Sequence, residues 1–86
     1  MNISVEFTLM PLQTDFDAPI IKFIKALRDS KFRVLENPLS TQIFGEYEAL
    51  MLFLTSTIKA SFDNIEHVVL NMKIVKSDRS DYEPHF

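Results

Sequence analysis

Four polar side chains alternate with apolar ones in two segments of the chain that have the pattern of β-strands. Glu6 and Thr8 lie near the beginning of the sequence, and Asn71 and Lys73 lie near its end. Side chains two residues apart point to the same face of a strand, so each pair shares one face. A carboxylate, a hydroxyl, an amide and an amine brought together could bind a small polar ligand, with Glu6 facing a cationic group. The simpler alternative is a cross-strand ion pair between Glu6 and Lys73, of about 0.2–1 kcal/mol.

Three further candidates for a ligand site lie close together near the middle of the sequence. Ser40 and Thr41 supply hydroxyl groups, and Phe44 supplies an aromatic ring against which a flat ligand could stack. Each also has a structural explanation, because the hydroxyls could satisfy the backbone of a turn and Phe44 could fill an interface. Asn71 differs, since an amide in the middle of a covered strand must find partners or costs about 1–3 kcal/mol. It is therefore expected to contact either a ligand or a polar network between subunits.

The sequence offers little for catalysis or for metal binding. It contains no cysteine, which excludes iron–sulfur clusters and thiolate metal sites. His67 is expected at the start of a strand and His85 in a polar tail, and neither is paired with a nucleophile. An enzyme would have Glu6 and His67 as its only candidate bases. We therefore predict a protein that is not an enzyme and that has no cofactor and no metal.

Composition places the chain among small globular proteins. Its 86 residues suffice for one domain, and 47% of them are hydrophobic. The net charge of −3 and the lack of a basic cluster argue against nucleic-acid binding. No apolar run approaches the roughly 18–20 residues that span a bilayer, and Glu6 interrupts the first apolar stretch, which is unlike a signal peptide. The expected location is the cytoplasm, with no membrane partner.

The positions of apolar residues predict six regular elements. Alternation predicts strands, and apolar residues at helical spacing predict two amphipathic helices. The expected elements are a strand over residues 3–12, a helix over 18–30, strands over 32–37 and 40–45, a helix over 46–62 and a strand over 67–75. Residues 1–76 are expected to form the domain, and residues 77–86 a polar tail that is mobile or packs on a partner.

The order β-α-β-β-α-β predicts an α+β fold of the ferredoxin-like type, which is a two-layer sandwich. Right-handed crossovers place both helices on one face of an antiparallel sheet with strand order 4-1-3-2. Gly45, the only glycine, lies between a strand and a helix, where a positive φ or a close backbone approach is expected. The expected core consists of Ile3, Val5, Phe7, Leu9, Ile20, Ile24, Leu27, Val34, Leu50, Leu54, Ile58, Val68, Leu70, Met72 and Ile74.

The other face of the sheet carries the polar candidates and has no helix over it. Met10 and Val69 are expected to add apolar area to this face, together with Leu35 and Phe44. A sheet face with that much apolar surface is usually covered by another molecule. The simplest cover is the same face of a second copy, which predicts a homodimer or homotetramer. A structural or regulatory homo-oligomerisation domain without a small ligand is therefore the alternative function.

Four segments of the chain resemble, in order, one family of known proteins. They are VEFTLMPL at residues 5–12, the first predicted helix with the strand that follows it, NPLSTQIFGE at 37–46, and VVLNMKI at 68–74 followed by Asp78 and Arg79. The similar family is that of small thiamine-binding proteins with a ferredoxin-like fold, including the YkoF-like domains that bind thiamine and hydroxymethylpyrimidine. The chain departs from the family at Ser40, where many members have glycine.

The resemblance implies binding of thiamine, of its phosphates or of its pyrimidine precursor, in oligomers built from sheet faces and without catalysis. The thiazolium cation of thiamine would then lie near Glu6. Phe44 would supply the stacking face, with Phe7 and Tyr47 as alternatives. The ligand-binding residues expected on this basis are Glu6, Thr8, Ser40, Thr41, Phe44, Asn71 and Lys73.

Overall fold

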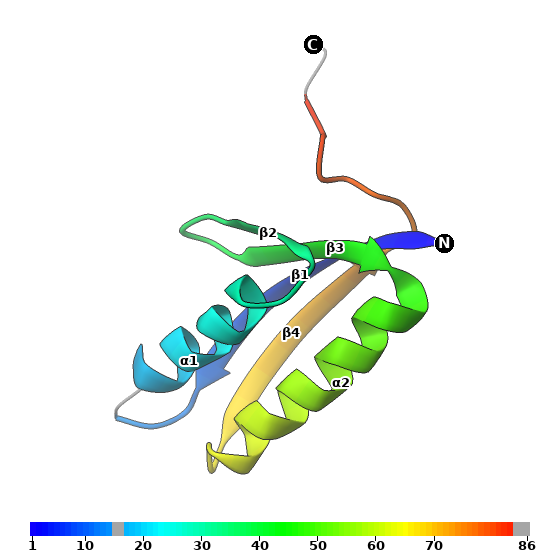
Figure 1. The fold of residues 1–86 in the computed structure, drawn as a ribbon. Coiled ribbons are helices and arrows are strands. Elements are labelled where there is room, and N and C mark those ends of the chain that lie inside the picture. The colour runs from blue at the N-terminus through cyan, green and yellow to red at the C-terminus, as the bar shows by residue number, and fades with distance from the viewer. Residues whose placement is uncertain (15–16, 84–86) are drawn as a thin grey trace.

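The computed structural model describes residues 1–14 and 17–83 and has the six elements in the predicted order (Figure 1). The elements are β1 (Asn2–Pro11), α1 (Asp17–Arg28), β2 (Arg33–Glu36), β3 (Thr41–Glu46), α2 (Tyr47–Asp63) and β4 (Val68–Val75). Helix α2 ends one residue beyond the predicted end at residue 62, and the backbone N–H of Asn64 donates to carbonyl groups of its last turn. Within the described ranges, no helix has the length and apolar character needed to cross a membrane.

The four strands form one antiparallel sheet in the order β2-β3-β1-β4, which is the predicted order read from the other edge. Both helices lie on the same side of this sheet, so the fold is the predicted ferredoxin-like two-layer sandwich (Figure 1). Strand β1 lies between β3 and β4, and its Glu6 stands opposite Gln42 on β3 and Lys73 on β4. Because opposite residues of an antiparallel pair point to the same side, this register fixes which side chains share a face.

The core lies between the sheet and the two helices. One face of β1 is buried here, and Phe7 meets Phe23 of α1 edge to face with ring centroids 5.7 Å apart. The alternation of β1 therefore gives the correct inward face. The buried members of the core cluster are Ile3, Val5, Phe7, Phe23, Leu27, Ile43, Leu50 and Leu54.

Two residues that the sequence predicts for the core are largely exposed. Met72 and Ile74 of β4 keep 41% and 44% of their surface accessible, because β4 is an edge strand and has a neighbour on one side only. Phe23 and Ile43 join the core instead, although the sequence pattern places Phe23 on the flank of its helix. The remaining predicted core residues are partly buried, namely Leu9, Ile20, Ile24, Val34, Ile58, Val68 and Leu70.

The N-terminus of α2 is capped by Glu46, the last residue of β3. Its carboxylate accepts a hydrogen bond from the Ala49 backbone N–H at 3.0 Å. That bond is the main reason that the pKa of Glu46 lies below its ordinary value. The predicted start of this helix at residue 46 is therefore the capping position, and regular helix begins at Tyr47.

Gly45 lies in β3 directly against the ring of Phe32. Its φ is not positive, so a close approach explains the glycine: a Cβ there would lie 2.6 Å from Phe32 Cδ1. The ring of Phe32 packs on Phe53, with centroids 5.5 Å apart, so it cannot move freely. We expect Gly45→Ala to lower the free energy of unfolding by about 1–2 kcal/mol in urea denaturation, because the ring must shift. The loss should be smaller in a Phe32→Leu background, and an equal loss in both backgrounds would contradict this explanation.

Candidate functional site

The side of the sheet opposite the helices, here called the open face, brings the predicted strand residues together. The register pairs Glu6 with Lys73 and Thr8 with Asn71, so these four side chains share the open face. This is the arrangement that the alternation of the two strands predicts. The other residues that the register places on this side are Ser4 and Met10 of β1, Val69 and Val75 of β4, Gln42 and Phe44 of β3, and Arg33 and Leu35 of β2.

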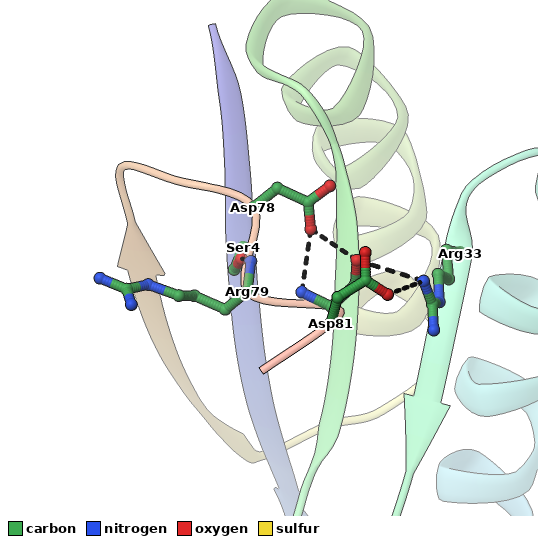
Figure 2. Close-up of polar contacts among 6 residues, drawn as sticks. Ser4, Arg33, Asp78, Arg79 and Asp81 are labelled. Carbon is green, nitrogen blue, oxygen red and sulfur yellow. Dashed lines mark hydrogen bonds and ion pairs between the residues drawn. The ribbon is translucent and has the colours of Figure 1, made fainter. Parts of the chain in front are cut away.

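Residues 77–82, here called the C-terminal strap, cross the open face (Figure 2). Ser4 of β1 anchors the strap: its Oγ donates a hydrogen bond to the Ser77 carbonyl at 2.7 Å and accepts one from the Arg79 backbone N–H at 2.8 Å. These contacts leave Ser4 only 7% exposed, although it lies on the side without helices. The segment thus packs on its own sheet, which differs from the mobile or partner-bound tail that the sequence suggests.

The far end of the strap is held at β2. Arg33 Nη1 lies 3.0 Å from Asp81 Oδ1 and donates a hydrogen bond to Ser80 Oγ at 3.3 Å. Within the strap, Asp78 accepts hydrogen bonds from the Ser80 hydroxyl at 2.6 Å and from its backbone N–H at 2.9 Å, which closes a turn. The strap is therefore fixed at two strands, β1 and β2, and passes over β3 between them (Figure 2).

Acid is expected to loosen the turn inside the strap. The hydrogen bonds from the Ser80 hydroxyl and amide lower the pKa of Asp78 below its ordinary value. A carboxylate with a lowered pKa stabilises the fold above its ordinary pKa, and this contribution is lost as the pH falls below about 4 and through the lowered value.

Nitrogen-15 relaxation at the Ser80 amide measures this loosening. The amide should be ordered near neutral pH and become more mobile as the pH falls through the lowered pKa of Asp78, whereas an Asp78→Asn variant should show no such change over the same titration. An amide that stays equally ordered in the acid wild-type protein would show that Asp78 does not hold the turn.

The strap and the open face together form an open cavity of about 580 Å³, a volume common for small-ligand sites. The apolar part of its lining comes from Leu35, Phe44, Val75 and Tyr82. The charged and amide groups come from Glu6, Gln42, Lys73 and Arg79. A flat apolar surface with a few polar groups at one side is typical of a site for a small aromatic ligand.

Glu6 is the one carboxylate among the described residues that line this cavity. Its Oε2 accepts a hydrogen bond from Ser40 Oγ at 3.1 Å, and its Oε1 lies 3.7 Å from Lys73 Nζ. The contact with Lys73 is long, and the Lys73 side chain is mostly exposed, so this ion pair contributes little to stability. The cross-strand pair expected from the sequence is present, and the half-exposed carboxylate of Glu6 can still receive a cationic ligand.

Thr8 and Asn71 lie beside the main cavity. They line a smaller depression of about 200 Å³ that also includes Glu6 and Lys73, so these two charged residues border both spaces. Asn71 is exposed in the single chain, where water can satisfy its amide. Its side chain is therefore available to a ligand or to a second subunit.

The side chains of Ser40 and Thr41 point to different sides of the sheet. Ser40 precedes β3 and reaches the open face through its hydrogen bond to Glu6. Thr41 stands opposite Phe7, whose ring is in the core, so Thr41 faces the helix side of the sheet. Of the two hydroxyl residues that the sequence proposes, only Ser40 contacts a residue of the open-face cavity, namely Glu6, and neither hydroxyl residue lines that cavity itself.

Phe44 is the aromatic residue on the sheet side of the cavity, where the strap leaves it 5% exposed. Phe7 and Tyr47, the other two candidates for a stacking face, do not reach this cavity. Phe7 is buried against the helices, and Tyr47 begins α2 on the other side of the sheet. Tyr82 and Arg79 join the site from the strap. Arg79 already appeared among the segments that carry the family resemblance, whereas no pattern in the sequence indicated Tyr82.

A second cavity, of about 600 Å³, lies between α1 and α2. Its described lining is mostly small or apolar, as at Ala26, Phe53 and Ala60, and Lys22 is the one charged residue in it. This lining supplies no carboxylate for a cationic ligand. The two cavities are similar in size, so their chemistry is what favours the open face as the site.

The described residues contain no group of three or more side chains of the kind that could hold a metal ion. His67 is exposed, and its ring lies 3.7 Å from the carboxylate of the adjacent Glu66. Its backbone carbonyl accepts a hydrogen bond from the Leu12 N–H at 2.8 Å, which joins the ends of β1 and β4. His67 therefore has the surroundings of a surface residue at a strand end, and His85 lies outside the described residues.

Solved structures with the same fold come from several bacteria. A Streptococcus pneumoniae protein is 25% identical, with a TM-score of 0.82 over 91% of this chain and 89% of its own. A Thermotoga maritima protein, described as a candidate for thiamine biosynthesis or salvage, is 18% identical, with a TM-score of 0.80 over 90% of this chain and 85% of its own. A Bacillus cereus domain of unknown function is 21% identical, with a TM-score of 0.74 over 90% of this chain and 77% of its own. A comparison with curated proteins gave no match.

A protein-family comparison covers almost the whole chain. The family described as thiamine-binding protein matches residues 5–86, which include β1 from Val5 onward, the other three strands, both helices and the strap. This match agrees with the resemblance carried by the four sequence segments. The chain belongs to the thiamine-binding protein family.

Proposed function

We propose that this protein binds thiamine or its pyrimidine precursor, without catalysing a reaction, in the cavity between the open face and the C-terminal strap. Membership of the thiamine-binding family supports a ligand of this class. The observation that carries the proposal is the position of Glu6: its carboxylate, held by Ser40, lines the same cavity as the aromatic ring of Phe44, and the cavity has a suitable size.

The chemistry of thiamine matches the polar and apolar parts of this cavity. Its thiazolium ring carries a positive charge, which the Glu6 carboxylate can offset in a partly desolvated site. Its aminopyrimidine ring has donors and acceptors on one edge, which the amide of Gln42 can pair. Phe44 and Tyr82 give the apolar surfaces that flat rings need.

Stabilisation by ligand is the first test of this function. Thiamine at one hundred times its dissociation constant should add about 2.7 kcal/mol to the free energy of unfolding, which raises the melting temperature by about 10–20 °C. Choline, a cation without the pyrimidine ring, is the matched control and should shift the melting temperature much less. Absence of any shift with millimolar thiamine and with hydroxymethylpyrimidine would contradict the proposal.

A homo-oligomer built on the open face is the second candidate function, and one observation favours it. Met10 and Val69 are opposite each other beyond the strap, and both are exposed. An apolar pair of this kind, at the uncovered end of a sheet face, suits contact with the same face of a second copy. Light scattering should then show a dimer or tetramer that Val69→Glu dissociates, and a monomer in the wild-type protein would exclude this candidate.

A further inference from the structure

We propose that the open-face site prefers ligands that carry a phosphate monoester, and that Arg79 recognises the phosphate. This inference rests on the proposed function, because it assumes that the ring part of the ligand lies beside Glu6. It goes further by assigning the chemical class of the ligand and the residue that selects it.

Arg79 differs from the other two arginines of the chain in its partners. Arg28 makes two hydrogen bonds to the Glu36 carboxylate, at 2.6 and 2.7 Å, and Arg33 contacts Asp81 at 3.0 Å. Arg79 donates its Nε–H to Ser77 Oγ at 2.8 Å, and no described carboxylate pairs with it. Its guanidinium group therefore keeps charge and donors that the described part of the chain does not neutralise.

The strap aims this guanidinium group along the open face. The backbone N–H of Arg79 is fixed to Ser4, and the side chain runs over β1 in the direction away from Asp81 (Figure 2). Arg79 lines the same cavity as Glu6 and Lys73. A ligand whose ring lies beside Glu6 would thus occupy a cavity that Arg79 also lines.

The charges of the cavity lining suit a ligand that is both cationic and phosphorylated. The lining has one carboxylate, from Glu6, and two cations, from Lys73 and Arg79, so it is positive while the whole chain has a net charge of −3. If Glu6 offsets a ring cation, the two basic groups are left for an anion. A guanidinium group binds phosphate oxygens through two parallel hydrogen bonds, which gives it the geometry to select a phosphate ester. Thiamine monophosphate has this combination of charges.

Calorimetric titration of the full chain with three probes tests the inference. The probes are thiamine, thiamine monophosphate and inorganic phosphate. We expect the wild-type protein to bind the monophosphate about ten-fold more tightly than thiamine. Arg79→Gln should bring the ratio of the two affinities close to one, because it weakens monophosphate binding more than thiamine binding, and Arg79→Lys should keep part of the preference. Lys25→Gln, which makes the same charge change at an exposed position on α1, should keep all of it.

The outcomes separate this inference from the function on which it rests. Equal affinities of the wild-type protein for thiamine and its monophosphate would overturn the inference and leave the proposed function standing. Binding of neither compound would overturn both. Binding of inorganic phosphate as tight as that of the monophosphate would also overturn the inference, because the ring would then contribute nothing. If Arg79→Gln fails to fold, the wild-type comparison still decides whether the site prefers a phosphate monoester, and Arg79→Lys tests the role of Arg79: an undiminished preference in that variant would overturn it.

Discussion

Replacing Glu6 with glutamine is expected to weaken thiamine binding by about 10- to 100-fold, because a charge-assisted contact with the thiazolium ring is lost. Glutamine keeps the size of the side chain and can still accept the hydrogen bond that Ser40 donates at 3.1 Å. The fold should persist, since the contact of Glu6 with Lys73 is long and exposed. Calorimetric titration of both proteins with thiamine measures the difference.

Hydroxymethylpyrimidine gives the Glu6 experiment an internal control. It has the pyrimidine ring of thiamine without the cationic ring, so Glu6→Gln should change its affinity by less than about two-fold if the carboxylate acts through charge. Lys73→Gln tests the opposite change of charge. Removing a nearby cation should leave thiamine affinity unchanged or raise it. An equal loss for both ligands in Glu6→Gln would mean that the carboxylate does not face the thiazolium ring.

Replacing Leu27 with alanine is expected to lower the free energy of unfolding by about 3–5 kcal/mol. Leu27 is the fully buried residue that α1 contributes to the core, and its removal leaves a cavity between the helix and the sheet. For a chain of this length the loss is a large share of the total stability. Urea denaturation, analysed as a two-state transition, gives the value.

Leu52→Ala is the matched control for the core substitution. Leu52 lies on α2 but is 73% exposed, so removing the same atoms there should change stability by no more than about 0.5 kcal/mol. Saturating thiamine should restore part of the stability lost in Leu27→Ala, because the ligand binds the folded state only. A loss below about 1 kcal/mol in Leu27→Ala would show that α1 is not packed as described.

The faces of β1 and β4 could be predicted because period-two alternation is a direct consequence of strand geometry. Glu6 and Asn71 lie on the open face for this reason, and Val5 lies in the core. The predicted strand order already places β4 at an edge, but alternation does not reveal how much of an inward residue stays exposed there. Ile74 is placed on the correct side of β4 by its alternation and is still exposed, because exposure at an edge depends on what lies beside the strand.

The C-terminal strap could not be predicted from pattern, because it packs through individual hydrogen bonds rather than through a repeating apolar face. Ser4 looks like an ordinary outward-facing polar residue of β1, and only its contacts with Ser77 and Arg79 show that it holds a distant segment. For the same reason the sequence does not predict Tyr82 at the cavity, because only the path of the strap places it there. The hydroxyl group of Thr41 and the family resemblance predict it for the site, and the register of β3 turns it to the other side.

Mapping of amide chemical shifts during a titration with thiamine tests the location of the site most directly. We expect the largest changes on the open face and the strap, at Glu6, Gln42, Phe44 and Arg79, and no change in the second cavity between α1 and α2. Changes concentrated at Ala26 and Ala60 of the second cavity, with an unaffected open face, would contradict the proposed location of the site.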